Sequence, residues 1–454
     1  MSKHLKIAIV GAGPAGIYAG NILKSQHPDV EIDLFDSLPA PYGLIRYGVA
    51  PDHPRIKGIV NSLHEMLAEG TIRFYGNVSF GSDLHLKDIR ENYHAVIFAT
   101  GAIKDASLDI PGVDFDGSFG AADFVSWYDG HPDYPRTWPL EAKDIAVLGN
   151  GNVALDVARV LAKLPDDMLS TDIPANVYAG LLQSPAADIH VFGRRGPQSI
   201  KFTPIELREL GEIKDVDIVL YEEDFAPRPG SDDWFDEDAE GVTNQNKVMA
   251  RVLNEWRTRQ STGAKRRLHL HFWHKPVEII GASGKVNGIK FERTAEAGAG
   301  AISNTGEHRE YNVQAVYRAI GYFGSELPGI PFDEKYGVIR NDGGRVIDEN
   351  GKRVVGIYAT GWIKRGPVGL IGHTKSDAIE TITNLVADLE TLVAPVADDL
   401  FERFAERDVQ YTDWAGWLKL NNHELALGAA DKSPIDRERV KVVDREEMVD
   451  VSRS

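Results

Sequence analysis

Two glycine-rich segments constrain the fold of this chain more than any other feature. They are Gly11–Gly16 (GAGPAG) and Gly149–Ala154 (GNGNVA), and each stands between a short apolar run and an amphipathic stretch. Glycines at this spacing let backbone N–H groups approach a pyrophosphate at the N-terminus of the following helix. We therefore expect an α/β protein with two Rossmann-like, dinucleotide-binding domains.

The first turn has the flanking residues that such a site needs. Leu5–Val10 predicts a buried parallel strand, a helix is expected from Pro14 to about Lys24, and a second strand over Val30–Phe35. A carboxylate at the end of that second strand accepts hydrogen bonds from a free ribose 2′-hydroxyl, which favours FAD over a 2′-phosphorylated nucleotide. The alternative is a glycine-rich turn without a ligand. The residues expected to hold this nucleotide are Gly11, Gly13, Pro14, Ala15, Gly16 and Asp36.

The second turn repeats this pattern with the opposite charge. Asp144–Leu148 predicts its strand, Asn152–Leu164 its helix, and Asp188–Phe192 the partner strand, which is followed by Arg194 and Arg195. Guanidinium groups at that place suit a 2′-phosphate, so this turn favours NADP. A solvated arginine pair on a loop is the alternative. Together the two turns indicate electron transfer between FAD and NADP(H).

Length and charge exclude several classes of protein. With 454 residues the chain is long enough for two cores, and it contains no apolar stretch near 18 residues that would predict a membrane span. The formal net charge of −18 argues against general nucleic-acid binding. Because the first predicted strand begins almost at Met1, a cleavable signal is not expected, and we predict a cytoplasmic location.

The absence of cysteine narrows the chemistry further. A chain without cysteine cannot pass electrons to a Cys-x-x-Cys disulfide, and it cannot hold an iron–sulfur cluster through its own thiolates. Electrons that reach a flavin must therefore leave to an external acceptor, which is a carrier protein, oxygen, a quinone or another small molecule.

Three apolar runs that end in small residues indicate how the two domains are connected. Ala95–Gly101 and Gly356–Gly361 both end in Ala-Thr-Gly, and Val316–Gly321 is a looser version. Such ends let the chain pass close to a cofactor or between domains. We predict an FAD-binding domain made of residues 1–103 and 323–454, the latter with a C-terminal extension, and an NADP-binding domain of residues 104–322 inserted between them. Within the insertion, Phe202–Gly211 predicts a helix and residues 268–320 predict strands and turns.

Four longer motifs carry a resemblance to a known family. They are Gly43–His53, Gly149–Asp156, Gly193–Pro197 and Gly361–Gly372. In their order and spacing the chain resembles adrenodoxin reductase and its bacterial ferredoxin–NADP reductase relatives over nearly its whole length. The resemblance implies FAD, NADP(H) and an electron carrier, either a ferredoxin-like iron–sulfur protein or a flavodoxin. One departure is Asp36, where the family pattern leads us to expect Glu.

The resemblance also implies binding residues. Those expected to line FAD are Leu44, Val78, Trp362, Gly369, Leu370 and Ile371; those expected to contact NADP are Asn150, Gly151, Asn152, Val153, Arg194, Arg195, Glu206 and Gly369. Without the motif, Trp362 would be read as an ordinary core aromatic. A helix predicted over His373–Leu392 would place its positive N-terminus near the flavin.

His53 and Glu209 match residues that lie near the nicotinamide–flavin contact in the family. Hydride transfer needs alignment and exclusion of water more than it needs an acid or base. We therefore expect the two side chains, the predicted catalytic residues, to orient groups or relay a proton. A loop histidine capped by Asp52 and neighbouring prolines is the alternative for His53.

Other patterns predict no metal site. Asp236–Gly241 begins like a calcium loop, but Lys247 stands where a bidentate glutamate is needed. His269, His271 and His274 show no acidic residue or further histidine placed to complete a ligand set.

The sequence therefore predicts an FAD-containing ferredoxin–NADP reductase. An NADPH-dependent reductase of quinones or small molecules and a non-enzymatic nucleotide-binding protein are the alternatives. Residues 247–267 carry seven basic side chains against one acid, and Lys201 and Arg208 add to them. This local charge predicts a docking surface for an acidic carrier; a solvated helix face is the alternative.

Overall fold

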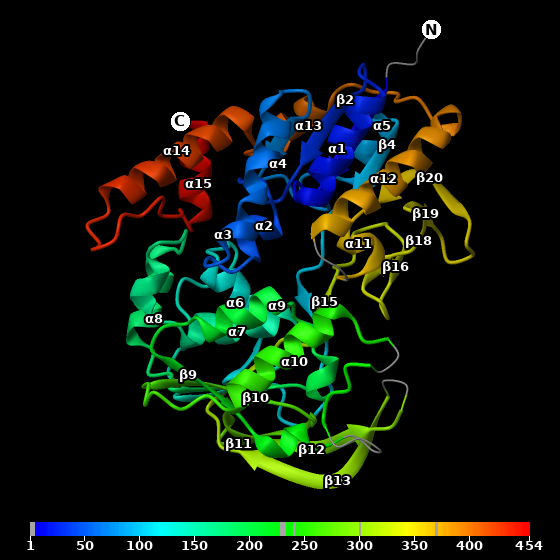
Figure 1. Ribbon diagram of the computed structural model, residues 1–454. Coiled ribbons are helices and arrows are strands. Elements are labelled where there is room, and N and C mark those ends of the chain that lie inside the picture. Colours follow the sequence, from blue (N-terminus) through cyan, green and yellow to red (C-terminus); the bar gives the residue numbers. More distant parts are fainter. Residues whose placement is uncertain (1–4, 228–232, 239–240, 299–300, 368–370) are drawn as a thin grey trace.

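The computed structural model describes residues 5–227, 233–238, 241–298, 301–367 and 371–454. Figure 1 shows two lobes. The upper lobe is built on an eight-stranded sheet whose strands all lie before residue 104 or after residue 322, and the lower lobe on a six-stranded sheet whose strands all lie between them. The arrangement is the two-unit dinucleotide-binding α/β fold that the two turns predict.

The upper sheet has the order β18-β19-β20-β4-β1-β2-β3-β21. Its strands are β1 (Lys6–Val10), β2 (Glu31–Phe35), β3 (Arg73–Gly76), β4 (Ala95–Phe98), β18 (Asn341–Asp342), β19 (Arg345–Ile347), β20 (Arg353–Ala359) and β21 (Thr412–Asp413). The strands from β20 to β3 are parallel, and antiparallel pairs close both edges. A short two-stranded sheet, β16 (Phe332–Asp333) with β17 (Val338–Ile339), lies beside it. The central strands are almost continuously apolar because helices cover both faces.

Helices of the upper lobe pack around α1, which follows the first turn. They are α1 (Pro14–Gln26), α2 (Leu44–Tyr47), α3 (Pro54–Lys57), α4 (Ile59–Ala68), α5 (Leu86–Asn92), α11 (Trp362–Arg365), α12 (Ile371–Ala387), α13 (Leu400–Glu406), α14 (Trp414–Ala430) and α15 (Arg445–Arg453). Helix α12 packs along α1, and α14 and α15 pack together at the C-terminus. The predicted helix over 373–392 thus begins two residues earlier and ends at Ala387.

The lower sheet is entirely parallel, in the order β6-β14-β7-β8-β10-β9. Its strands are β6 (Ser118–Gly120), β7 (Asp144–Leu148), β8 (Asp188–Phe192), β9 (Val216–Leu220), β10 (Arg266–His271) and β14 (Ala315–Arg318). An antiparallel sheet of β11 (His274–Ala282), β12 (Lys285–Glu296) and β13 (Ile302–Tyr311) lies at the bottom of Figure 1. The helices of the lower lobe are α6 (Ala121–Tyr128), α7 (Asn152–Ala162), α8 (Ala175–Gln183), α9 (Pro204–Gly211) and α10 (Asn244–Arg257).

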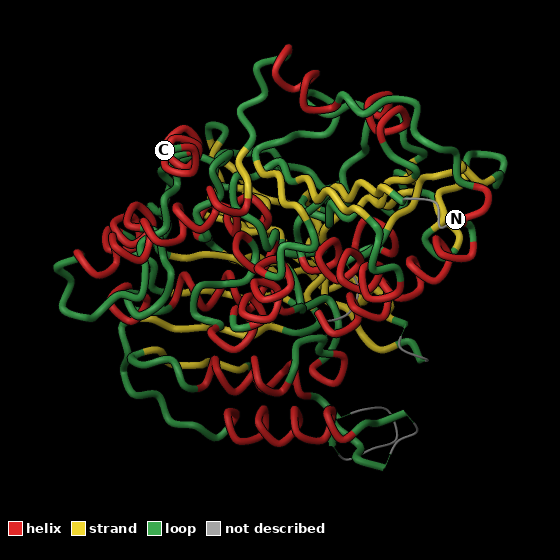
Figure 2. The backbone as a smooth tube through the Cα atoms, turned by 90° about the horizontal axis from the view of Figure 1, so that it is seen from above, coloured by secondary structure: helices red, strands yellow, loops and turns green. Residues whose placement is uncertain are grey.

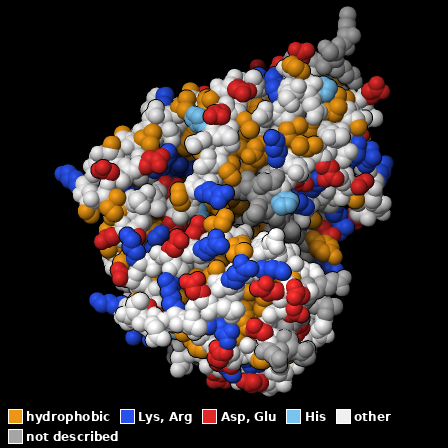
Figure 3. Space-filling view, viewed as in Figure 1, with side chains coloured by type: hydrophobic (Ala, Val, Ile, Leu, Met, Phe, Trp, Pro, Cys, Tyr) orange, Lys and Arg blue, Asp and Glu red, His pale blue; other side chains and the backbone are white. Residues whose placement is uncertain are grey.

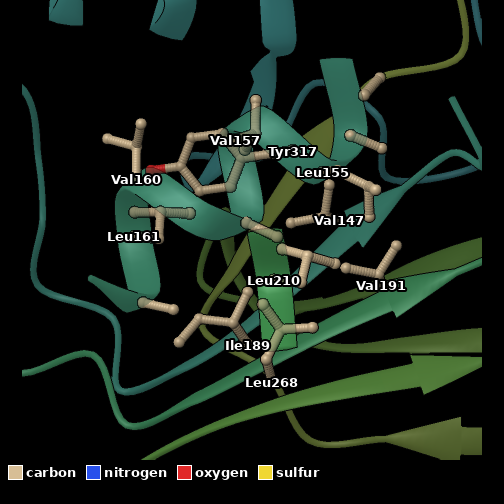
Figure 4. Close-up of a cluster of buried hydrophobic side chains, with 14 of the residues drawn as sticks. Val147, Leu155, Val157, Val160, Leu161, Ile189, Val191, Leu210, Leu268 and Tyr317 are labelled. Carbon is tan, nitrogen blue, oxygen red and sulfur yellow. The ribbon is translucent and has the colours of Figure 1, made fainter. Parts of the chain in front are cut away.

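The core of the lower lobe explains why β7 is apolar at every position after Asp144. Ile145 and Val147 face a cluster under α7 and α9, while Ala146 and Leu148 face a second cluster under β12. Figure 4 shows the first cluster, in which side chains of α7 and α9 meet those of β7, β8 and β10. Helix α7 ends at Ala162, before the predicted Leu164, because Lys163 and Leu164 are already extended ahead of Pro165.

The two lobes are joined by two chain crossings that pair with each other. Strand β5 (Lys104–Asp105) and strand β15 (Tyr322–Phe323) form an antiparallel ladder. Figure 2, which views the molecule from above, shows the two bodies stacked along the line of sight. Among the described residues, no helix combines the length and apolarity that crossing a bilayer requires.

Candidate functional site

The first turn has a backbone geometry that only glycine can adopt. Gly11 has φ +111°, and its N–H donates to the carbonyl of Phe35 at 2.7 Å. A Cβ on Gly11 would lie 2.4 Å from the carbonyl oxygen of Ala99, at the end of β4. The Ala-Thr-Gly residues that follow that strand therefore have small side chains because they pack closely against the turn.

The second turn has the same geometry with different residues. Gly149 has φ +148°, and its N–H donates to the carbonyl of Phe192 at 3.0 Å. A Cβ there would lie 2.2 Å from the carbonyl oxygen of Ala319, which directly follows β14. The looser Ala-Ile-Gly run therefore packs closely against the second turn, as the Ala-Thr-Gly run packs against the first.

Segments distant in sequence complete a cradle around the N-terminus of α1. Gly361 has φ +74°, and a Cβ on it would lie 2.6 Å from Cβ of Ala15. A Cβ on Gly43 would lie 3.0 Å from Cα of Gly13. Beside Gly361, the fully buried hydroxyl of Thr360 has no hydrogen-bond partner among the residues that the structure describes. A backbone cradle and an unsatisfied buried hydroxyl fit a bound dinucleotide, FAD by the reasoning above.

Asp36 is bound to the turn itself. One oxygen of its carboxylate accepts from the N–H of Ala12 at 2.6 Å, and the other accepts from the N–H of Leu38 at 2.9 Å. Burial raises the pKa of Asp36 to about 6, although both hydrogen bonds oppose that shift. The side chain therefore holds the turn in shape, and its contact with a ribose stays a prediction.

The other residues predicted to line FAD lie around the same cradle. Leu44 begins α2 next to Gly43, and Val78 is buried beside Asp36, to whose carbonyl its N–H donates at 2.8 Å. Trp362 begins α11 and packs against a buried group that includes Tyr322. Gly369 and Leu370 lie outside the described residues, as does the side chain of Ile371.

The N-terminus of α7 is open toward a ligand. A Cβ on Gly151 would meet nothing within 4 Å. The next residue, Asn152, has a buried side-chain oxygen that finds no hydrogen-bond partner in the described part of the chain. Asn150 lies behind the turn, where a Cβ on Gly193 would be 3.1 Å from its amide nitrogen. Open glycine and an unsatisfied amide oxygen fit a second dinucleotide at this turn.

The arginine pair follows β8 with its backbone fixed and its side chains turned outward. The hydroxyl of Thr294 donates to the carbonyl of Arg194 at 2.7 Å, and the N–H of Trp273 donates to that of Arg195 at 3.2 Å. Arg194 is exposed, and Arg195 is half-buried, with a buried Nε that has no hydrogen-bond partner within the described ranges. This pair is therefore available to a phosphate.

The two turns face each other across the gap between the lobes. Val153, from the second turn, and Trp362, from the upper lobe, both pack against the buried group Ala102, Ala122 and Tyr322. Ligands held at the two turns would thus meet near α11. Figure 3 shows the molecule hollowed between the lobes at this height.

Glu206 is engaged by the helix that carries it. Thr203 caps α9, and the N–H of Thr203 donates to the Glu206 carboxylate at 2.8 Å in a capping box. Burial raises the pKa of Glu206 above its ordinary value. The implied contact with NADP stays a prediction, because the described contacts of this side chain serve the helix.

His53 and Glu209, the predicted pair, come together between the lobes. His53 Nδ1 lies 3.3 Å from Glu209 Oε2, and on the other side His53 Nε2 lies 2.8 Å from Asp156 Oδ1. Burial would lower the pKa of His53, but the hydrogen bond and charge of Asp156 outweigh it and raise the pKa. The ring is therefore placed to hold a proton between two carboxylates.

Asp156 is the functional residue that sequence reasoning missed. It lies on α7 in the motif Gly149–Asp156, one turn after the glycines, but its partner His53 is 103 residues away. The alternative in which Asp52 caps His53 is wrong, because the Asp52 carboxylate pairs with Arg159 at 2.8 Å and with Lys163 at 3.0 Å.

The expectation that His269, His271 and His274 lack partners is also wrong. His190 Nδ1 lies 2.9 Å from His271 Nε2, and His269 Nε2 lies 2.9 Å from Asp188. The missed signal was the neighbouring position of β8 and β10, which sets His190 directly beside His269.

Ring orientation opposes a shared metal ion at this cluster, although its ligand atoms lie close together. The rings of His190, His269 and His271 are nearly parallel, with interplanar angles of 13–26°, so their nitrogens do not converge on one point. Burial lowers the pKa of His190 to about 3, which keeps the stack neutral. The segment Asp236–Gly241 lies partly outside the described residues.

Comparison with known proteins agrees with this geometry. Residues 5–172 match the family model for pyridine nucleotide-disulphide oxidoreductases. NADPH-ferredoxin reductase FprA of Mycobacterium leprae is 39% identical over 98% of this chain and 97% of its own length. The mitochondrial NADPH:adrenodoxin oxidoreductase of Arabidopsis thaliana is 35% identical over 96% of this chain and 94% of its own. The structure of Mycobacterium tuberculosis FprA in complex with NADPH superposes over 100% of both chains with a TM-score of 0.90 at 36% identity.

Proposed function

The chain belongs to the family of adrenodoxin reductase and the bacterial NADPH–ferredoxin reductases, and we propose that its electron acceptor is a ferredoxin-like iron–sulfur protein docking on the lower lobe. The protein is an FAD-containing ferredoxin–NADP⁺ reductase. Bound at the first turn, FAD would supply the conversion between two-electron chemistry with NADPH and one-electron transfer to the carrier. The observation that carries this function is the pair of turns with side chains of opposite charge, whose neighbours Val153 and Trp362 pack against one buried group between the lobes.

The chain's own residues supply position and charge to this reaction. The glycine cradle at Gly11 and Gly361 orients the flavin nucleotide, and Arg194 with Arg195 selects the 2′-phosphate of NADPH. His53, held from both sides by Asp156 and Glu209, keeps a proton available at the meeting point of the two sites. Trp362 packs on the buried group that includes Tyr322 and so provides an apolar wall between the two turns. Gly369 and Leu370 keep their predicted role as neighbours of the cofactors.

The proposed docking surface contains fewer of the basic side chains of residues 247–267 than the sequence predicted. Within residues 247–267, Arg257 pairs with Glu222 and Arg267 pairs with Asp188, so both are committed to the fold. Lys201 and Arg208 are exposed and have no ion pair within the part of the chain that the structure describes. Figure 3 shows lysine and arginine side chains gathered over α9 and α10, on the side that faces the upper lobe. This position supports a carrier that docks beside α9.

A pair of charge reversals tests this docking surface. Arg208→Glu should raise the KM for ferredoxin roughly tenfold at low salt, because two to three charge pairs worth a few tenths to 1 kcal/mol each are lost or inverted. Arg257→Glu is the matched control, and it should change the KM less than about twofold. NADPH-driven cytochrome c reduction with and without added ferredoxin gives the measurement. Equal KM values for both variants and the unmodified protein would place the carrier elsewhere.

The division into residues 1–103, 104–322 and 323–454 is part of this proposal. It is supported by the two sheets, whose strands fall on either side of these boundaries, and by the paired crossings β5 and β15. Limited proteolysis that cuts near residues 103 and 322 would support it. The cytoplasmic location stays a prediction, because the Arabidopsis thaliana and Bos taurus relatives are named as mitochondrial.

A further inference from the structure

The segment that follows α14 and ends at the first residue of α15, residues 431–445, connects the two lobes through charged side chains, several of them buried. We call it the C-terminal strap. Figure 1 shows it leaving α14 and passing above α8 before it reaches α15. Three of its basic side chains reach the lower lobe, although the strap belongs to the upper one: Arg437, Lys441 and Arg445.

Lys441 is the centre of these contacts. Its side chain is fully buried, and its ammonium group lies 2.9 Å from the carboxylate of Asp172 and 3.7 Å from that of Asp129. It also donates to the carbonyl of Asp129 at 3.1 Å and to the carbonyl of Arg46 at 2.9 Å. Asp129 and Asp172 belong to the lower lobe, and Arg46 lies on α2 of the upper lobe, so one side chain ties both.

A second lysine closes the cluster from the side of the active site. Lys57 Nζ lies 3.3 Å from Asp129 and 3.1 Å from Asp172. Lys57 ends α3, the helix that begins directly after His53, and its N–H donates to the carbonyl of His53 at 3.0 Å. The two lysines and two aspartates therefore fix α3, and with it His53, against the lower lobe.

The ends of the strap are held as firmly as its centre. Arg445 donates to both carboxylate oxygens of Asp133 in the lower lobe, at 2.7 and 2.8 Å, and also to the carbonyl of Ser37 in the upper lobe at 2.8 Å. Arg437 donates to the carbonyl of Ile173 in the lower lobe. On the upper side, the N–H of Val442 donates to Glu424 of α14 at 3.1 Å.

We propose that the C-terminal strap is a clamp that sets the separation of the two nucleotide sites, with Lys441 as its positioning residue. The inference rests on the proposed function, since a separation matters only if the two sites exchange electrons. A displacement of about 1 Å between reacting groups costs on the order of a hundredfold in rate. The paired crossings β5 and β15 and the contacts of Asp52 and His53 with α7 join the lobes at other places. The strap adds a further contact at the face where α2 and α3 meet the lower lobe.

The test compares Lys441→Met with Lys419→Met, the same substitution at an exposed position of α14. In anaerobic stopped-flow experiments with the holoenzyme, Lys441→Met should lower the limiting rate of flavin reduction at saturating NADPH by about tenfold or more. The dissociation constant for NADP⁺ should change less than about twofold, since Lys441 does not contact that site. Lys419→Met should leave both values unchanged.

A measurement of the distance between the two lobes distinguishes a clamp from a structural defect confined to the surroundings of Lys441. The chain has no cysteine, so Glu69→Cys and Gln183→Cys accept spin labels at one exposed position in each lobe without competing sites. The distance distribution between the labels should be narrow in the parent and broader or longer with Lys441→Met. A slower rate with an unchanged distribution, or no change in either, would overturn the clamp.

The exposed contact between Asp133 and Arg445 provides a second variant if Lys441→Met does not fold. Asp133→Asn removes a partner of Arg445 at an exposed site, and it should lower the limiting rate by about two- to threefold and broaden the same distribution slightly. An unchanged rate and distribution in Asp133→Asn would overturn the proposal. Absence of NADPH-driven flavin reduction in the parent protein would instead contradict the function itself, so the two failures are distinguishable.

Discussion

The two nucleotide-binding turns have the same backbone conformation. They differ in the direction of the charged side chain that follows the next strand. In both, the first glycine donates to the last residue of the next strand and leaves no room for a Cβ beside an alanine carbonyl. Asp36 turns inward and binds the N–H groups of Ala12 and Leu38, whereas Arg194 turns outward from a fixed backbone. The two turns therefore have the same backbone conformation, and we expect the side chain after the next strand to determine which nucleotide each turn selects.

This difference has an energetic consequence. The carboxylate at the first turn is used by the protein, so its removal should damage the fold of the turn as well as the binding of the flavin. The arginines at the second turn make few contacts with the protein through their side chains, so their removal should affect the nucleotide alone. The following changes test that contrast, beginning with the largest effect.

Replacing both arginines should nearly abolish the preference for NADPH. Each charge-assisted contact to the 2′-phosphate contributes about 1.5–3 kcal/mol, so Arg194→Ala with Arg195→Ala should raise the KM for NADPH at least about a hundredfold. The KM for NADH should change little, because NADH lacks that phosphate. Steady-state kinetics with both nucleotides gives the comparison, and an equal loss with both would show that the arginines support the fold.

Replacing Asp36 should change the pH dependence of stability. Its pKa of about 6 in the folded protein lies above the ordinary 3.8, so the native state binds the proton more readily than the unfolded state. Wild-type protein should therefore lose up to about 3 kcal/mol relative to Asp36→Asn as pH rises from 4 to 6, and no more above that. Guanidinium unfolding of both proteins between pH 4 and 7.5 measures this difference. A difference independent of pH would mean that Asp36 is not buried as described.

An increase in salt concentration should weaken nucleotide binding at the second turn more than at the first. This is the smallest of the three expected effects. Raising ionic strength from about 0.05 to 0.5 M should raise the KM for NADPH by several-fold, because the phosphate and the exposed Arg194 are screened. Retention of FAD should be almost insensitive, since the first turn holds its ligand through backbone groups. Ultrafiltration followed by flavin fluorescence checks retention, and salt-induced loss of FAD at the same rate would contradict the contrast.

The sequence predicted the parts of the site that are local. Strand, turn, helix and the charged residue after the next strand follow one another within each turn, so the pattern alone placed Asp36 and Arg194. The partners of His53 and His190 depended on strand order and on how the lobes meet. Nothing near His53 indicates that Asp156 would reach it, and nothing near His269 indicates that β8 would lie beside β10. The strap was missed for the same reason, because Lys441 finds its partners on three separate segments.

The most direct test of the account is anaerobic reduction of the purified yellow protein by each nicotinamide nucleotide. The account predicts one non-covalent FAD per chain, identified after acid precipitation, and bleaching of the flavin by NADPH at least about a hundredfold more efficiently than by NADH. Recovery of FMN, recovery of no flavin from folded protein, or equal efficiency with both nucleotides would contradict it.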